Sequence, residues 1–191
     1  MKALLRPVVV VVLLHFAAQL THGGDQYKFD AVHSSVLFRI KHMSISYCYG
    51  RFNEVSGIFR LDEQNPVASE IDITVATDSI DTANTQRDAH SRNADFFDAP
   101  KYPTIRFQAT KVGRTCARPF AVEGNPMMHG VTRPITIAIE STGAGKGMFG
   151  KMRTGLEAVF TIRRSDFGMD KRAGAIGDDV RLMVSLEGFR Q

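Results

Sequence analysis

The chain has 191 residues, of which 43% are hydrophobic and 23% are charged. These values are typical of one packed globular domain and exclude a disordered chain. The 24 basic and 20 acidic residues leave a net charge of only +4, without a prominent basic run, which argues against a nucleic-acid partner.

The start of the chain has the features of a secretory signal. Lys2 and Arg6 supply positive charge, an unbroken apolar run follows at residues 8–14, and small residues come next. The run is shorter than the ~20 residues that span a bilayer comfortably, although a retained membrane anchor stays an alternative. The sequence therefore predicts a signal peptide over residues 1–23, a mature domain over residues 24–191 and a periplasmic or secreted location.

Alternation with a period of two dominates the rest of the chain. Apolar side chains recur at every second position, separated by polar ones, in eight stretches. The stretches are residues 35–42, 55–61, 70–75, 105–109, 120–122, 135–140, 156–162 and 180–187. Such strands belong to an antiparallel sheet, and a single sheet this long must curl or close to bury its apolar face and its edges. The sequence predicts an all-β fold, an antiparallel eight-stranded barrel.

One stretch breaks this alternation. Residues 81–95 contain few β-branched residues, and Asp81 is suited to cap a helix over residues 82–94. Asp88 and Arg92 lie four apart, which predicts an ion pair on the helix surface. We expect this helix to lie beside or across one mouth of the barrel.

Signals for catalysis, cofactors or metals are weak. The histidines after the signal are spread over many elements without the spacing of metal ligands. The sequence contains neither a Gly-x-Ser-x-Gly elbow nor the spacing of a Walker loop. Cys48 and Cys116 could pair in an oxidising compartment, and the sequence leaves this open. We therefore predict no enzyme, no cofactor and no metal site.

Several short motifs occur together along the domain. They are Val36 to His42, Tyr49 to Phe52, Gly57 to Phe59, Arg87 to Phe97 followed by Lys101-Tyr102-Pro103, His129 to Pro134, and Ser165 to Gly168. In this order and spacing the chain resembles the YceI-like family of polyisoprenoid-binding, lipocalin-like proteins, over about residues 27–188. The resemblance implies a periplasmic or secreted barrel around a long isoprenoid chain with a quinone- or pyrophosphate-type head. The lack of tryptophan and the segment 113–119 depart from the pattern.

The predicted binding site combines an apolar wall with a polar rim. The wall consists of the inward-facing residues Phe38, Ile40, Phe59, Ile71, Ile73, Phe107, Ile137, Phe160, Leu182 and Val184. His42 ends the first of these strands, and Arg87 and His90 share one face of the helix, so these three could bind a polar head at the mouth. Alternation directs Arg39 and Lys41 outward. Arg87 and His90 could instead anchor the helix to the barrel.

The predicted function is storage, transport or sequestration of an isoprenoid or other long-chain lipid, with transient membrane contact. Two alternatives stay open at this point. One is an enzyme that acts on a lipid head group through His42, His90 and an acidic neighbour. The other is a stress-induced structural protein whose barrel is empty.

Overall fold

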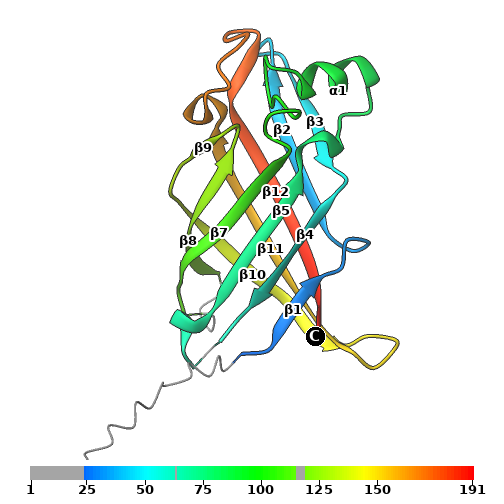
Figure 1. Cartoon of the computed structure of the whole chain (residues 1–191), viewed down its shortest axis with the longest axis vertical. Helices are drawn as coiled ribbons and strands as arrows, with labels where there is room; N and C mark the ends of the chain where they lie inside the picture. The colour runs from blue at the N-terminus through cyan, green and yellow to red at the C-terminus, as the bar shows by residue number, and fades with distance from the viewer. Residues whose placement is uncertain (1–23, 63, 115–118) are drawn as a thin grey trace, which may run out of the picture.

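The structure, a computed structural model, describes residues 24–62, 64–114 and 119–191 (Figure 1). Its strands are β1 (Gln26–Phe29), β2 (Ser35–His42), β3 (Ser46–Phe52), β4 (Val55–Arg60), β5 (Glu70–Ala76), β6 (Ile80–Asp81), β7 (Thr104–Val112), β8 (Phe120–Met128), β9 (Val131–Thr132), β10 (Ile135–Lys146), β11 (Met152–Arg163) and β12 (Ile176–Arg190). Its helices are α1 (Thr85–Arg92) and the 3-10 turns η1 (Pro66–Ala68), η2 (Thr77–Ser79) and η3 (Arg164–Phe167). Within these parts of the chain, no helix is long and apolar enough to cross a membrane.

Eight antiparallel strands close into a barrel, as the alternation predicted (Figure 1). β1 and β2 together form the first strand of the ring, β3 and β4 form the second, and β5, β7, β8, β10, β11 and β12 form the others. The long strand β12 closes the ring, because its C-terminal end pairs with β1 and its N-terminal part pairs with β2. Phe29 thus lies opposite Gly188, and Val36 lies opposite Val184. Closure leaves the ring without the open edges that would invite aggregation.

Apart from the two-residue strands β6 and β9, two of the strands were not expected from the sequence. β1 has only four residues, which is too short for alternation to be recognised. β3 carries exposed tyrosines at positions 47 and 49 and a glycine at position 50, so it has no continuous apolar face. Both are held by pairing with neighbours that do alternate, β1 with β4 and β12, and β3 with β2.

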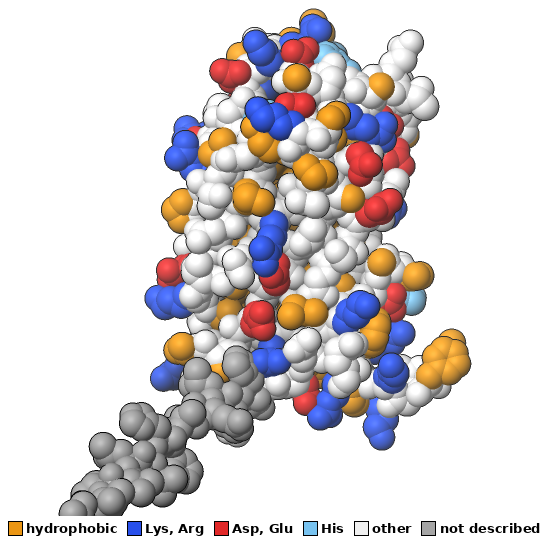
Figure 2. Space-filling model, in the orientation of Figure 1, with side chains coloured by type: hydrophobic (Ala, Val, Ile, Leu, Met, Phe, Trp, Pro, Cys, Tyr) orange, Lys and Arg blue, Asp and Glu red, His pale blue; other side chains and the backbone are white. Residues whose placement is uncertain are grey.

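One face of the outer surface mixes charged and apolar side chains. Figure 2 shows basic and acidic side chains scattered along the barrel, with apolar side chains between them. Scattered surface hydrophobics of this kind are normal in soluble proteins. The inward faces of the strands therefore supply most of the core.

Aromatic side chains fill the end of the barrel that contains β1, here called the closed end. Phe59 is 0% exposed, and its ring stacks on Tyr27 at a centroid distance of 5.3 Å and lies 5.5 Å from the ring of Phe29. Gly188 on β12 makes room for this packing, because a Cβ there would lie 2.5 Å from the Phe59 ring. The closed end is thus packed solid across the barrel axis.

An ionic cluster links β11 and β12 to the loop after β1. The Arg153 Nη1 lies 2.6 Å from Asp30 Oδ2 and 2.5 Å from Glu187 Oε1, and His33 Nδ1 lies 2.9 Å from Asp30 Oδ2. The hydrogen bond from Arg153, and after it that from His33, lowers the pKa of Asp30 to about 2. The charged form of Asp30 is therefore favoured in the folded protein.

We expect this cluster to make folding sensitive to acid. The pKa of Asp30 is lower in the folded protein than its ordinary value of 3.8, so its stabilisation is present above about pH 4 and is lost as the pH falls through about 2. We expect a loss of about 1 kcal/mol, because partial solvent exposure of Arg153 screens the pair. Denaturant unfolding at pH 5 and pH 2 should show a smaller loss for Asp30→Asn than for the wild type. Equal losses would contradict this assignment.

Candidate functional site

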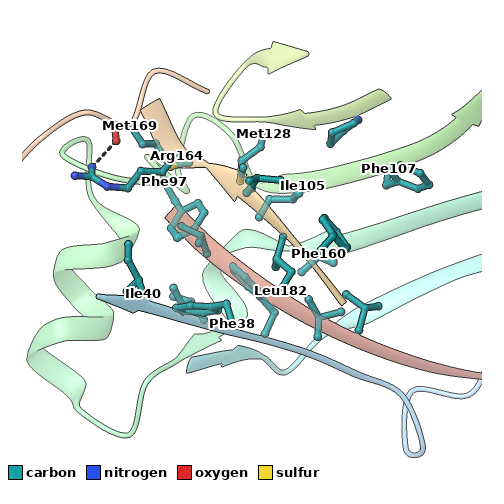
Figure 3. Close-up of a pocket in the computed structure, with 18 of the residues that line it drawn as sticks. Phe38, Ile40, Phe97, Ile105, Phe107, Met128, Phe160, Arg164, Met169 and Leu182 are labelled. Carbon is teal, nitrogen blue, oxygen red and sulfur yellow. Dashed lines mark hydrogen bonds between the residues drawn. The ribbon is translucent and has the colours of Figure 1, made fainter. Parts of the chain in front are cut away.

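A cavity of about 280 Å³ occupies the barrel interior between the closed end and α1 (Figure 3). Its wall comes largely from the inward faces of β2, β5, β7, β10, β11 and β12. Alternation positions these side chains, so that Phe38 of β2 lies opposite Leu182 of β12, and both face inward. The opening lies beside α1, where the exposed residue His42 borders the cavity, and is here called the mouth.

Every predicted site residue except Phe59 lines this cavity. The members are Phe38, Ile40, His42, Ile71, Ile73, Arg87, His90, Phe107, Ile137, Phe160, Leu182 and Val184. The structure thus brings these residues together, and their contact with a ligand stays a prediction. Phe59 differs from the expectation: it lies opposite Tyr27 of β1 at the closed end and is fully buried, so it packs in the core and is not among the residues that line the cavity.

Some lining residues were missed because they lie outside the alternating stretches. Phe96 and Phe97 come from the turns after α1, and Met169 comes from the segment after η3. Lys41 also borders the cavity, although its ammonium lies 5.6 Å from the centre of the Tyr47 ring. Cys48 lines the cavity too, whereas Cys116 lies outside the described residues, so their pairing, which the sequence left open, is not tested.

The helix beside the mouth is shorter than predicted and has a different cap. It begins at Thr85, and Asn84 is the N-cap, whose side chain accepts a hydrogen bond from the Arg87 backbone N–H at 2.9 Å. Asp81 instead accepts from the Ala83 N–H at 2.9 Å. The reason is local, because Ala83 has a φ of +59° and turns the chain between β6 and α1.

The predicted ion pair between Asp88 and Arg92 does not form. Asp88 is 8% exposed, and its Oδ1 accepts hydrogen bonds from the Thr82 N–H at 2.8 Å and the Thr82 hydroxyl at 2.5 Å. Arg92 donates to the carbonyls of Asp78 at 2.7 Å and Ile80 at 2.8 Å. Packing of α1 against β6 offers partners in and around β6, which these side chains use in place of each other. Both residues fix the helix at the mouth.

Removing the Asp88 carboxylate should therefore destabilise the fold. We expect Asp88→Ala to cost about 1–3 kcal/mol of unfolding free energy, because it leaves the buried Thr82 N–H without an acceptor. Urea unfolding measures this loss. The control is Asp95→Ala near the end of the same helix, where the carboxylate is 48% exposed and the cost should stay within about 0.5 kcal/mol. Equal effects of the two substitutions would contradict the assignment.

Arg87 and His90 border the cavity and also have partners of their own. Arg87 donates from Nε to the Thr82 hydroxyl at 2.8 Å and from Nη2 to the Thr82 carbonyl at 2.6 Å. His90 Nε2 lies 3.1 Å from Asp95 Oδ2, and its ring meets Phe96 edge-on at 5.0 Å. Arg87 thus links α1 to the residue after β6, which is the anchoring role that the sequence left open. Contact of either side chain with a head group stays a prediction.

The sequence analysis missed a buried cation in the cavity wall. Arg164 is 5% exposed and follows β11 directly. Its Nε donates to the Gly177 carbonyl at 2.9 Å and its Nη2 to the Ile176 carbonyl at 3.1 Å, while Nη1 donates to the Met169 carbonyl. Burial lowers the pKa of the Arg164 guanidinium from its ordinary value. The sequence did contain a sign of this residue's position. Every second residue of β11 faces inward, and position 164 is the next inward position after Ile162.

The comparisons with known proteins agree with this architecture. The model of the YceI-like domain matches residues 27–188. A UPF0312 protein of Pseudomonas paraeruginosa is 39% identical over 178 residues, which cover 92% of each chain.

Solved structures share the fold. The crystal structure of BcnA from Burkholderia cenocepacia superposes with a TM-score of 0.75 at 20% identity, covering 83% of this chain and 98% of that one. A polyisoprenoid binding domain from Saccharophagus degradans, implicated in plant cell wall breakdown, superposes with a TM-score of 0.68 at 17% identity, covering 86% and 98%. The family model and the sequence relatives confirm the resemblance seen in the motifs, and the chain belongs to the YceI-like family.

Proposed function

We propose that the protein binds a lipid of isoprenoid type, a polyprenyl or quinone-like molecule, in the barrel cavity. The observation that carries this proposal is an apolar cavity that is blocked at one end and reaches the surface at the other. Family membership and the polyisoprenoid binding domain among the structural neighbours support it. The lipid would be stored, transported or sequestered outside the cytoplasm.

The chemistry of the wall suits such a ligand. An isoprenoid tail is hydrocarbon, and each buried CH₂ equivalent contributes up to about 0.8 kcal/mol. Ordering a long flexible tail offsets a good part of that gain. The polar end of the lipid should lie near water at the mouth, because an unpaired polar head deep in the barrel would be costly.

Native mass spectrometry of the exported protein tests the proposal. We expect a mass above that of the bare chain, which organic solvent removes and which returns when a polyprenyl phosphate or a prenylated quinone is offered. A bare chain, even after both lipids are offered, would contradict the proposal and favour an empty barrel. Turnover of the prenyl phosphate to a new product would favour the enzyme alternative.

Export is a separate part of the proposal. Residues 1–23 lie outside the described residues, so the signal rests on the sequence alone. N-terminal sequencing of the exported protein should give a start between Gln19 and Tyr27. An intact Met1 on a membrane-bound product would mean that the segment is a retained anchor.

A further inference from the structure

The mouth contains a buried positive charge that is paired only with neutral groups. The three acceptors of Arg164 are the backbone carbonyls of Met169, Ile176 and Gly177. No carboxylate of the described residues lies within ion-pair distance of its guanidinium. Asp178 and Asp170 are close enough to act on the guanidinium through space without forming an ion pair, and Asp178 is engaged by the backbone N–H and hydroxyl of Ser165 at 2.9 and 2.7 Å. A buried charge without a charged partner is costly, so it calls for a functional explanation.

The other cations of the cavity lining differ from Arg164 in exposure. Lys41 and Arg87 are both exposed to solvent. Water therefore screens their charges, whereas the charge of Arg164 acts in a less polar environment. Electrostatic attraction between Arg164 and a ligand group at the mouth would be correspondingly stronger.

The guanidinium of Arg164 has unused hydrogen-bond donors. It carries five N–H groups in a planar fork, and the three hydrogen bonds of the structure use one on each nitrogen. Figure 3 shows this group at the α1 end of the cavity, with Phe107 far along the barrel toward the other end. A lipid with its tail beside Phe107 would have its head near Arg164.

We infer that Arg164 binds the polar head of the lipid, and that this head presents an oxygen acceptor to its guanidinium. The inference rests on the proposed function and adds a requirement, since a hydrocarbon without a head would bind less tightly. A phosphate oxygen and a quinone carbonyl share the acceptor chemistry that a guanidinium recognises.

The test compares three probes with the same prenyl tail on the delipidated full-length protein: a prenyl phosphate, a prenylated quinone and the hydrocarbon without a head. Dissociation constants come from displacement of a lipophilic fluorescent dye. For the wild type we expect at least one head-bearing probe to bind about tenfold tighter than the hydrocarbon, which corresponds to about 1.4 kcal/mol. A preference for the phosphate that weakens with salt identifies an anionic head, and a salt-independent preference for the quinone identifies a carbonyl.

Two variants assign the preference to Arg164. Arg164→Met should abolish the preference and leave the hydrocarbon dissociation constant unchanged. The matched control is Arg163→Met, which removes the neighbouring arginine whose Nη2 pairs with Asp166 at 2.9 Å on the outside. This control should keep the wild-type preference. A preference that survives in Arg164→Met would overturn the inference.

Arg164 holds the segment from Met169 to Gly177, so Arg164→Met could fail to fold. A second variant covers that outcome. Arg164→Lys keeps the charge but lacks the planar fork, so the quinone preference should be lost while part of the phosphate preference remains. The wild-type protein alone can also contradict the inference. Equal affinities for all three probes would overturn it and leave the proposed function intact. No binding of any probe would overturn both.

Discussion

Replacing Ala158 with phenylalanine is expected to block lipid binding while the barrel stays folded. Ala158 lies on β11 opposite Val184 of β12, and both side chains line the cavity. The added ring would occupy space that the tail requires, and displacing the equivalent apolar contact should cost about 1.5–3 kcal/mol of binding free energy. The affinity for a prenyl lipid should therefore fall by about 10- to 100-fold, measured by dye displacement.

The next residue along the strand provides a matched control. Val159 points outward and is 45% exposed, so Val159→Phe adds a ring of the same size on the outer face. We expect this variant to bind lipid like the wild type, and both variants to keep the wild-type melting temperature within a few degrees. Wild-type affinity in Ala158→Phe would show that the tail does not occupy this part of the barrel.

The largest loss of stability is expected at the closed end. Phe59→Ala removes a fully buried ring from between Tyr27 and Phe29, and such substitutions cost about 3–5 kcal/mol. Urea unfolding of the lipid-free protein should show this loss. Phe149→Ala removes an equal ring that is 88% exposed in the turn between β10 and β11, so the change there should stay within about 0.5 kcal/mol.

The Phe59→Ala variant also tests whether Phe59 belongs to the packed core or to the binding cavity. Because Phe59 does not line the cavity, the folded fraction of Phe59→Ala should keep its lipid affinity within about threefold. A large loss of affinity at unchanged stability would place Phe59 in the binding site, as the sequence analysis supposed.

The barrel could be predicted from the sequence because each wall strand has one apolar and one polar face. The side chains of Phe38, Ile40 and Leu182 were assigned to the inside by parity alone, and the structure confirms it. The alternation of inward and outward side chains could not show how far along the barrel axis a residue lies. It therefore grouped Phe59 with the cavity residues, although register places Phe59 opposite Tyr27 of β1 at the closed end.

The details of the mouth depend on tertiary contacts that local sequence does not reveal. Spacing on an isolated helix suggested that Asp88 would pair with Arg92, but Asp88 accepts from the buried Thr82 and Arg92 donates to backbone carbonyls beside β6. Arg164 was missed for a related reason. The alternating run was taken to end at Ile162, and only the contacts with the segment after η3 show that Arg164 continues it on the inward side.

Among the described residues, the packed rings of Tyr27, Phe29 and Phe59 block one end of the barrel, and the cavity opens at the other end, beside α1. A lipid bound as proposed, with its head at the mouth, would have to enter tail first and leave by the same end. Its head would be the last part to enter and the first to leave. A membrane or protein that delivers or receives the lipid would therefore approach the end beside α1. A tail longer than the cavity would have to fold back inside it or extend out of the mouth.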